Sequence, residues 1–261
     1  TLKRNNENIG TVTTKSVLWM GSYGLTKDIN IIAGLPYVWT EATAGTLKGL
    51  KGVQDASLAV KWKALEKHNG ATRYRLFAVA GASMPVSDYV ADFQPLSIGL
   101  QSRTAYLRAM GDYQRGRFFT TALASYHLRS NVTIDRQAYY TTEMHYTDEV
   151  RMPDANFVQL RAGYRSPQLV AEVVADKWTT LGGFDIRRND MPFPSNRMNA
   201  TRVGLALKYE PSWLANWTFI GNYSETVAGR NMGQGRSLSA GLFYIFNFNP
   251  KGTSVNTTNS N

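Results

Sequence analysis

Residues 56–64 read ASLAVKWKA, a stretch in which large apolar side chains alternate with polar or small ones. The first set is Ala56, Leu58, Val60, Trp62 and Ala64, and the second is Ser57, Ala59, Lys61 and Lys63. Successive side chains of a β-strand point to opposite faces of its sheet. The period of two therefore predicts a strand with one apolar face and one polar face.

The same alternation recurs along nearly the whole chain, and no segment shows a period of 3.6 residues over the length of a helix. We expect about 11 strands of roughly 10–13 residues, close to the length that crosses a bilayer at a tilt. Their predicted spans are 11–24, 28–41, 55–65, 72–85, 100–114, 117–129, 155–165, 168–179, 198–210, 215–227 and 236–248. The sequence thus predicts an all-β protein.

The composition excludes several classes of protein. The 261 residues include 29 Lys plus Arg against 19 Asp plus Glu, for a net charge of +10, and no Cys. The absence of Cys excludes a disulfide scaffold, a thiolate metal site and a cysteine nucleophile. The sequence contains no run of about 18 apolar residues, so no transmembrane helix is predicted. The mean hydropathy of −0.31 still allows a membrane barrel, because only alternate residues of such a barrel face lipid.

The connections between the predicted strands alternate in length. Short turns are expected at Leu25–Lys27, Glu66–Ala71, Arg115–Gly116, Ser166–Pro167 and Pro211–Leu214. Long polar loops are expected at Ala42–Gln54, Val86–Gly99, Ser130–Asp154, Thr180–Arg197 and Ala228–Gly235. Short periplasmic turns and long external loops are typical of bacterial outer-membrane barrels. We therefore predict an antiparallel transmembrane β-barrel in the outer membrane of a Gram-negative bacterium.

The order of the turns also bears on the number of strands. If the short turns are periplasmic, the strand at 11–24 runs inward, whereas single-chain bacterial barrels usually have an even strand count and a periplasmic N-terminus. We therefore expect one outward strand before Thr1, and about 12 strands of which about 11 are in this chain. Residues 1–248 are predicted to form one barrel domain, and the polar residues 249–261 a disordered tail.

Two features indicate which face of each strand meets lipid. Large aromatic residues lie near strand ends on the apolar face, as an interfacial girdle requires: Tyr37, Trp39, Tyr74, Tyr164, Tyr209, Trp217 and Tyr223. The opposite face carries charges in mid-strand, which must face the lumen in a membrane and would face water on a soluble barrel. The predicted lumen-lining residues are Lys61, Lys63, Arg75, Arg108, Asp112, Arg161, Glu172, Asp176, Arg202 and Lys208. Seven are basic and three acidic, so we expect a mild preference for anions.

One hairpin allows its cross-strand pairs to be predicted. If Ser166-Pro167 is a two-residue turn, Arg161 lies opposite Glu172, and Phe157 lies opposite Asp176. Such pairs could brace the barrel without contacting a solute. The lumen of a small barrel can also be filled by its own side chains, and the inward aromatic residues expected here are Phe77, Phe119, Phe157 and Phe243.

The last predicted strand alternates apolar residues and ends in aromatic ones. Gly241, Tyr244, Phe246 and Phe248 resemble the C-terminal assembly signal of Gram-negative outer-membrane proteins, which implies the barrel-assembly machinery as a partner. The signal normally ends the chain, whereas here residues 249–261 follow it.

Three short motifs resemble a known family. Residues 21–30 read GSYGLTKDIN, residues 35–38 read LPYV, and residues 52–55 read GVQD before a strand with a central lysine. This pattern is similar to that of the outer-membrane transporter family named for the phenol meta-degradation pathway, and it covers roughly residues 10–85. The resemblance implies a small outer-membrane channel or transporter for a solute that it does not identify. It implies no catalytic residues.

The sequence contains few groups for catalysis. Of His68, His127 and His145, only His127 has a serine at a suggestive spacing, Ser125, as a lipase-type site would require. No glycine-rich phosphate loop and no metal-ligand spacing is present. We expect neither an enzyme nor a cofactor or metal site.

The cations are spread along the chain rather than gathered in a stripe, so no nucleic-acid partner is expected. Arg187, Arg188, Lys48 and Lys51 lie in predicted external loops, where they could bind lipopolysaccharide phosphates or be ordinary solvated charges. The expected partners are outer-membrane lipid and lipopolysaccharide. The alternative function is that of a non-transporting structural or accessory subunit that binds other outer-membrane proteins.

Overall fold

The computed structural model describes residues 10–187 and 190–246, and this part of the chain contains strands and no helix. The all-β prediction is therefore confirmed. No helix within these residues could cross a membrane. The long strands are β1 (Val12–Gly24), β2 (Ile29–Ala42), β4 (Asp55–Asn69), β5 (Thr72–Pro85), β6 (Thr104–Arg115), β7 (Phe118–Arg129), β12 (Ala155–Arg165), β13 (Leu169–Thr180), β14 (Asn199–Tyr209), β15 (Trp217–Arg230) and β16 (Arg236–Tyr244).

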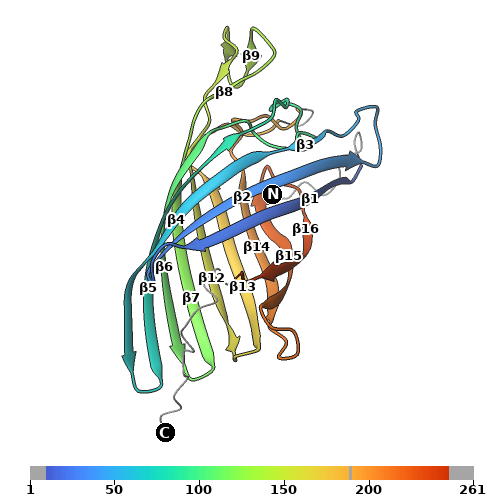
Figure 1. Cartoon of the computed structure of the whole chain (residues 1–261). Coiled ribbons are helices and arrows are strands. Elements are labelled where there is room, and N and C mark those ends of the chain that lie inside the picture. The colour runs from blue at the N-terminus through green and yellow to red at the C-terminus, as the bar shows by residue number, and fades with distance from the viewer. Residues whose placement is uncertain (1–9, 188–189, 247–261) are drawn as a thin grey trace.

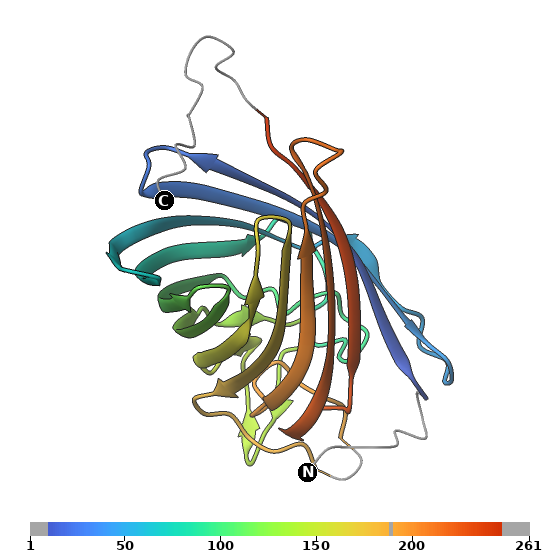
Figure 2. The ribbon, with the colours of Figure 1, turned by 90° about the horizontal axis from the view of Figure 1, so that it is seen from below.

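These strands form one antiparallel sheet in which each long strand pairs with the next one along the chain. Short β3 (Lys51–Val53) adds to β2. The sheet curls from β1 through to β16, as Figures 1 and 2 show. Within the described residues β1 pairs only with β2, and β16 pairs only with β15. The additional strand expected before Thr1 lies outside the described residues.

The antiparallel order places all short turns at one end of the sheet and all long loops at the other (Figure 1). The loop of residues 130–154 carries two further ladders: β8 (Val132–Thr133) pairs with β11 (Glu149–Val150), and β9 (Tyr139–Tyr140) with β10 (Met144–His145). We call this segment the β8–β11 extension. Val132, Ile134, Val150 and Met152 form its buried apolar cluster. The sequence predicted only a polar loop here.

The predicted register between β12 and β13 is wrong by two residues. Arg161 lies opposite Val174, Glu172 lies opposite Gly163, and Asp176 lies opposite Gln159. The hairpin closes between Ser166 and Leu169, where the Leu169 amide donates to Ser166 Oγ (3.0 Å) and the Ser166 amide donates to the Leu169 carbonyl (2.8 Å). A serine hydroxyl that bonds the nearby backbone favours this wider turn over the two-residue one. A shift of two residues leaves each side chain on its predicted face.

A second correction concerns β4, which continues to Asn69 where a turn was expected from Glu66. The pairing of β4 with β5 shifts between Lys63 and Leu65, so Ala64 forms a β-bulge. Because the bulge adds one residue, Glu66 lies on the same face as Lys63 despite their odd spacing. His68 is consequently in the strand rather than in a turn.

The last strand ends at Tyr244 rather than at residue 248. Its Gly241 and Tyr244 lie in β16, and the Tyr244 ring contacts those of Trp217 and Phe246 at centroid distances of 5.0 and 4.7 Å. Phe248 and the predicted tail of residues 249–261 lie outside the described residues.

Candidate functional site

One face of the curled sheet, which we call the outer face, is apolar and exposed. Its mid-strand residues include Leu58, Val60, Leu76, Leu107, Leu160, Val173, Leu205 and Leu207, all exposed. The ladder register places the seven predicted girdle aromatics on this same face. Apolar side chains exposed on one entire face of a sheet are expected where that face meets lipid rather than water.

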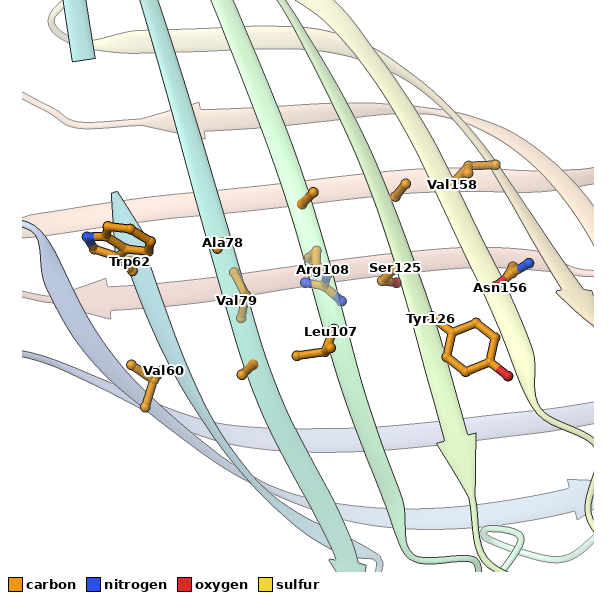
Figure 3. Close-up of a pocket in the computed structure, with 13 residues that line it drawn as sticks. Val60, Trp62, Ala78, Val79, Leu107, Arg108, Ser125, Tyr126, Asn156 and Val158 are labelled. Carbon is orange, nitrogen blue, oxygen red and sulfur yellow. The ribbon is translucent and has the colours of Figure 1, made fainter. Parts of the chain in front are cut away.

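Small residues leave shallow grooves in the outer face. One groove of about 770 Å³ lies across β4, β5, β6, β7 and β12. Figure 3 shows its lining residues, among them Val60, Trp62, Leu107, Tyr126 and Val158. Ala78, Ala109 and Ala124 pair in one row across the floor of this groove. The surface that lines this groove is therefore mostly apolar.

The opposite face, which we call the inner face, carries the charged residues. The ladder register places all ten predicted lumen residues on it. Lys61, Arg108, Asp112 and Arg161 lie on β4, β6 and β12 in the middle of the sheet. That these residues line a conducting path stays a prediction.

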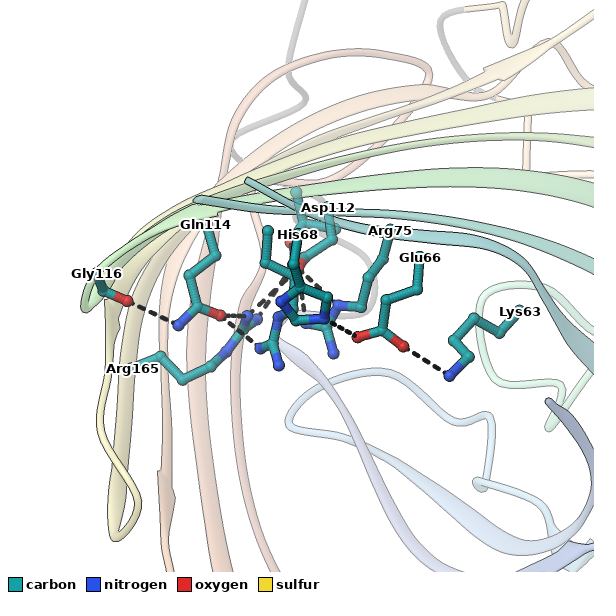
Figure 4. Close-up of polar contacts among 10 residues, drawn as sticks. Lys63, Glu66, His68, Arg75, Asp112, Gln114, Gly116 and Arg165 are labelled. Carbon is teal, nitrogen blue, oxygen red and sulfur yellow. Dashed lines mark hydrogen bonds and ion pairs between the residues drawn. The ribbon is translucent and has the colours of Figure 1, made fainter. Parts of the chain in front are cut away.

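Asp112 is the centre of the main polar cluster on the inner face (Figure 4). Its side chain is 4% exposed, and its carboxylate accepts hydrogen bonds from Arg75 Nη2 at 2.6 Å, Thr121 Oγ1 at 2.8 Å and Arg165 Nη2 at 3.2 Å. Gln114 Oε1 accepts from Arg165 Nη1 at 2.7 Å. Arg75 comes from β5, Asp112 and Gln114 from β6, Thr121 from β7 and Arg165 from β12, so the cluster ties four strands together.

Most other acidic residues of the inner face are also paired with cations. Arg161 Nη1 donates to Glu172 Oε1 at 2.9 Å, diagonally across the ladder, and Arg202 Nε donates to Asp176 Oδ1 at 2.8 Å. The bulge at Ala64 lets Lys63 reach Glu66 at 2.7 Å (Figure 4). The predicted Arg161–Glu172 ion pair therefore forms, although its register differs.

Several inner-face cations have no carboxylate partner within the described residues. Lys61 Nζ lies 4.5 Å from the centroid of the Phe77 ring, and the Arg108 guanidinium lies 5.2 Å from that of Tyr106. The Tyr106 ring lies over Gly81, where a Cβ atom would be 2.5 Å from it, so this position requires glycine. Buried Nε atoms of Arg73 and Arg108 lack any hydrogen-bond partner. The inner face thus carries an excess of positive charge.

A loop covers part of the inner face at the end with the long connections. In the β5–β6 connection, Tyr89 and Ile98 pack against the inner-face residue Val38. The connection is held there by Thr40 Oγ1, which donates to the Leu96 carbonyl at 2.5 Å, and by Tyr89 Oη, which donates to Asp55 at 2.5 Å. Burial raises the pKa of Tyr89, so the phenol stays protonated as a donor. The connection therefore covers inner-face residues at this end of the sheet.

Sequence reasoning missed several residues of this site. Arg73 is in the same alternating series as Arg75, and Arg165 is in that of Arg161. The same pattern could therefore have assigned both residues, which lie near strand ends, to the inner face. Thr121 and Gln114 are uncharged and gave no signal as partners of an ion pair. Glu66 could not have been assigned, because the bulge reverses its face.

The Ser125–His127 pair exists but does not resemble a catalytic site. Ser125 Oγ lies 2.9 Å from His127 Nε2, and Ser125 is 6% exposed on the inner face. The His127 ring packs between those of Tyr106 and Trp178. Within the described residues no carboxylate bonds to His127, and no group of three metal-ligating side chains occurs. The absence of an enzymatic activity stays a prediction.

The fold resembles that of a known channel. No protein-family model matches the chain, and no curated protein matches it. The crystal structure of the COG4313 outer membrane channel from Pseudomonas putida F1 superimposes with a TM-score of 0.66 and 16% identity, over 88% of this chain and 82% of that one. A structure from work on the in-meso crystallization of membrane proteins gives a TM-score of 0.39 at 12% identity, too low for an argument. The similarity shows a shared fold.

Proposed function

We propose that this protein is a passive outer-membrane channel for a small solute, with a mild preference for anions. The observation that carries the proposal is the inner face of the curled sheet, where Lys61, Arg73 and Arg108 have no carboxylate partner among the described residues. The fold similarity to an outer membrane channel supports a transport role. The finer resemblance to the phenol meta-degradation transporters stays a prediction, since no family model matches.

The reversal potential in a planar bilayer tests this proposal. With a gradient of potassium chloride across the bilayer, we expect a potential of the sign that an anion-preferring pore gives, because the inner face is net positive. Steps of single-channel current establish that a pore exists. Clear cation selectivity would contradict the anion preference, and the absence of current steps would contradict the channel.

Location in a membrane predicts unequal losses of stability for two neighbouring substitutions on β14. Leu205→Arg on the outer face is expected to lower the free energy of unfolding by about 2–4 kcal/mol, because it puts a charge in hydrocarbon. Ala206→Arg is the matched control, since Ala206 lies on the inner face opposite Glu172 and should cost far less. Urea titration of the protein folded in lipid vesicles measures both. Equal effects would argue against the assigned faces.

A second candidate function is that of an accessory subunit in a larger outer-membrane complex. The observation that favours it is the β8–β11 extension, which projects beyond the sheet (Figure 1) and exposes 87% of Tyr146. Native mass measurement in mild detergent distinguishes the two functions. A stoichiometric partner lost on deletion of residues 134–148 would favour the accessory role.

The lipopolysaccharide contact is also a proposal. Lys48 and Lys51 are exposed in the β2–β4 connection, where they are available to phosphate groups. Arg187, by contrast, is engaged with Asp190 at 2.8 Å and lies over the Tyr140 ring at 4.5 Å. Arg188 lies outside the described residues. The barrel-assembly machinery remains the partner expected from Gly241, Tyr244 and Phe246.

A further inference from the structure

A cavity of about 780 Å³ lies among the external loops, apart from the polar cluster of the inner face. It is bounded by the end of β7, by the β8–β11 extension and by the connection between β13 and β14. Its lining includes Arg129, Tyr139, His145, Arg151, Phe184 and Ser195. The volume is in the range of small-molecule sites, which are about 300–1,000 Å³.

Two of the lining residues have a buried polar atom without a hydrogen-bond partner. Ser195 is 7% exposed, and its Oγ has no hydrogen-bond partner in the part of the chain that the structure describes. Arg129 Nη2 is also unpartnered, although Arg129 Nε donates to the Pro153 carbonyl at 2.6 Å and thereby fixes the side chain. Buried polar groups are normally hydrogen-bonded, and each exception needs an explanation. Both unsatisfied atoms can donate a hydrogen bond, and the described residues supply no acceptor for either of them.

The charge of the cavity favours an anionic ligand. Arg151 lines it and makes no ion pair with any described residue. The carboxylate among the lining residues, Asp154, already accepts from the Tyr126 hydroxyl at 2.9 Å and from the Arg129 amide at 3.0 Å. The lining also has an apolar part, which includes Phe184, Leu181 and Tyr139, whose ring stacks on that of His145 at 4.8 Å, beside the polar Asn131 and Thr141.

The connection that carries Ser195 and Phe184 is held in place by its own contacts. Asp185 pairs with Arg230 at 2.5 Å and accepts from Asn231 Nδ2 at 2.7 Å, and these donors hold the pKa of the carboxyl below its usual range. Asn196, 2% exposed, donates to the Phe184 carbonyl. The cavity is therefore a preformed feature of the loops.

We propose that this cavity binds a small organic carboxylate with a short apolar chain. The two carboxylate oxygens would accept from Arg129 Nη2 and Ser195 Oγ, with Arg151 supplying further positive charge, while the apolar chain would contact Tyr139 and Phe184. A phosphate group would satisfy the donors but leave the aromatic wall exposed to water. Binding at this site does not depend on the proposed channel function, because it can be measured without current.

Isothermal titration calorimetry of the whole chain in detergent micelles tests this site, with butyrate, butanol and inorganic phosphate as probes and empty micelles as the blank. We expect butyrate to bind, and butanol and phosphate to bind at least tenfold more weakly. Arg151→Gln and Ser195→Ala should each weaken butyrate binding at least tenfold. Arg103→Gln is the matched control, because Arg103 is an exposed arginine at the same end of the barrel that does not line the cavity.

A heat-dependent shift in gel mobility shows whether each variant is folded, and only folded variants are compared. Butyrate binding that survives both Arg151→Gln and Ser195→Ala would overturn the site. Phosphate binding without butyrate binding would overturn the assignment to a carboxylate. Bilayer currents that stay unchanged in a variant without butyrate binding would show that the channel function does not depend on this site. Failure of the site and failure of the proposed channel are therefore distinguishable.

Discussion

Replacing Asp112 by alanine is expected to lower the free energy of unfolding by about 3–5 kcal/mol, the usual cost of breaking a buried ion pair by removing one partner. The carboxylate is nearly inaccessible to solvent and lies between Arg75 and Arg165. Without it, two guanidinium groups would face each other on the inner face with no compensating charge. Thr121, which now donates to Asp112, would also lose its acceptor.

Urea titration in lipid vesicles, followed by tryptophan fluorescence, measures this loss. The matched control is Glu41→Ala, which removes a carboxylate from the Lys15–Glu41 pair, where the two side chains are 49% and 55% exposed. Exposed ion pairs contribute about 0–1 kcal/mol to stability, so the free energy of unfolding of this variant should be close to that of the parent. If Asp112→Ala cost no more than Glu41→Ala, the cluster would not stabilise the sheet.

Exchanging two inner-face cations for acids should reverse the ion preference of the channel. The double variant Lys61→Glu with Arg108→Glu changes a row in which Lys61 and Arg108 both pair with Val79 across β4, β5 and β6. Neither side chain has an ion-pair partner among the described residues, so both charges act on ions near the inner face. We expect the reversal potential to change sign, toward cations.

The control for this experiment makes the same charge change on the other face of the same strands. Lys67 and Arg115 are exposed residues of β4 and β6 that lie on the outer face. Lys67→Glu with Arg115→Glu should leave the reversal potential near that of the parent. An unchanged potential in the inner-face double variant would show that this row lies outside the ion path.

Much of the fold was predictable, and the reason is local. The face on which Lys61 or Trp62 lies depends only on its place in an alternating run, because successive side chains of a strand point to opposite faces of the sheet. Predicted strand limits such as 72–85 and 155–165 coincide with β5 and β12. The prediction went wrong where the alternation is interrupted, at the bulge of Ala64 and the turn at Ser166.

The candidate site was predictable only as a set of residues on one face. Alternation assigns Asp112 and Arg165 to the inner face, but nothing local says that they meet, because 53 residues separate them. Their contact depends on the registers of two successive pairings, that of β6 with β7 and that of β7 with β12. The cavity among the loops has no sequence signal at all, since Arg129 ends β7, Arg151 lies in the β7–β12 connection and Ser195 lies in the β13–β14 connection.

The sequence by itself determined the strands, their antiparallel order and the chemistry of each face, because these depend on a period of two residues and on the lengths of the connections. The tertiary structure alone decided which cations keep a carboxylate partner and where a ligand could bind. Those outcomes depend on the register of the strands. The turn that the Ser166 hydroxyl favours shifts the β12–β13 register by two residues from the predicted one, and the extra residue Ala64 shifts the β4–β5 register by one.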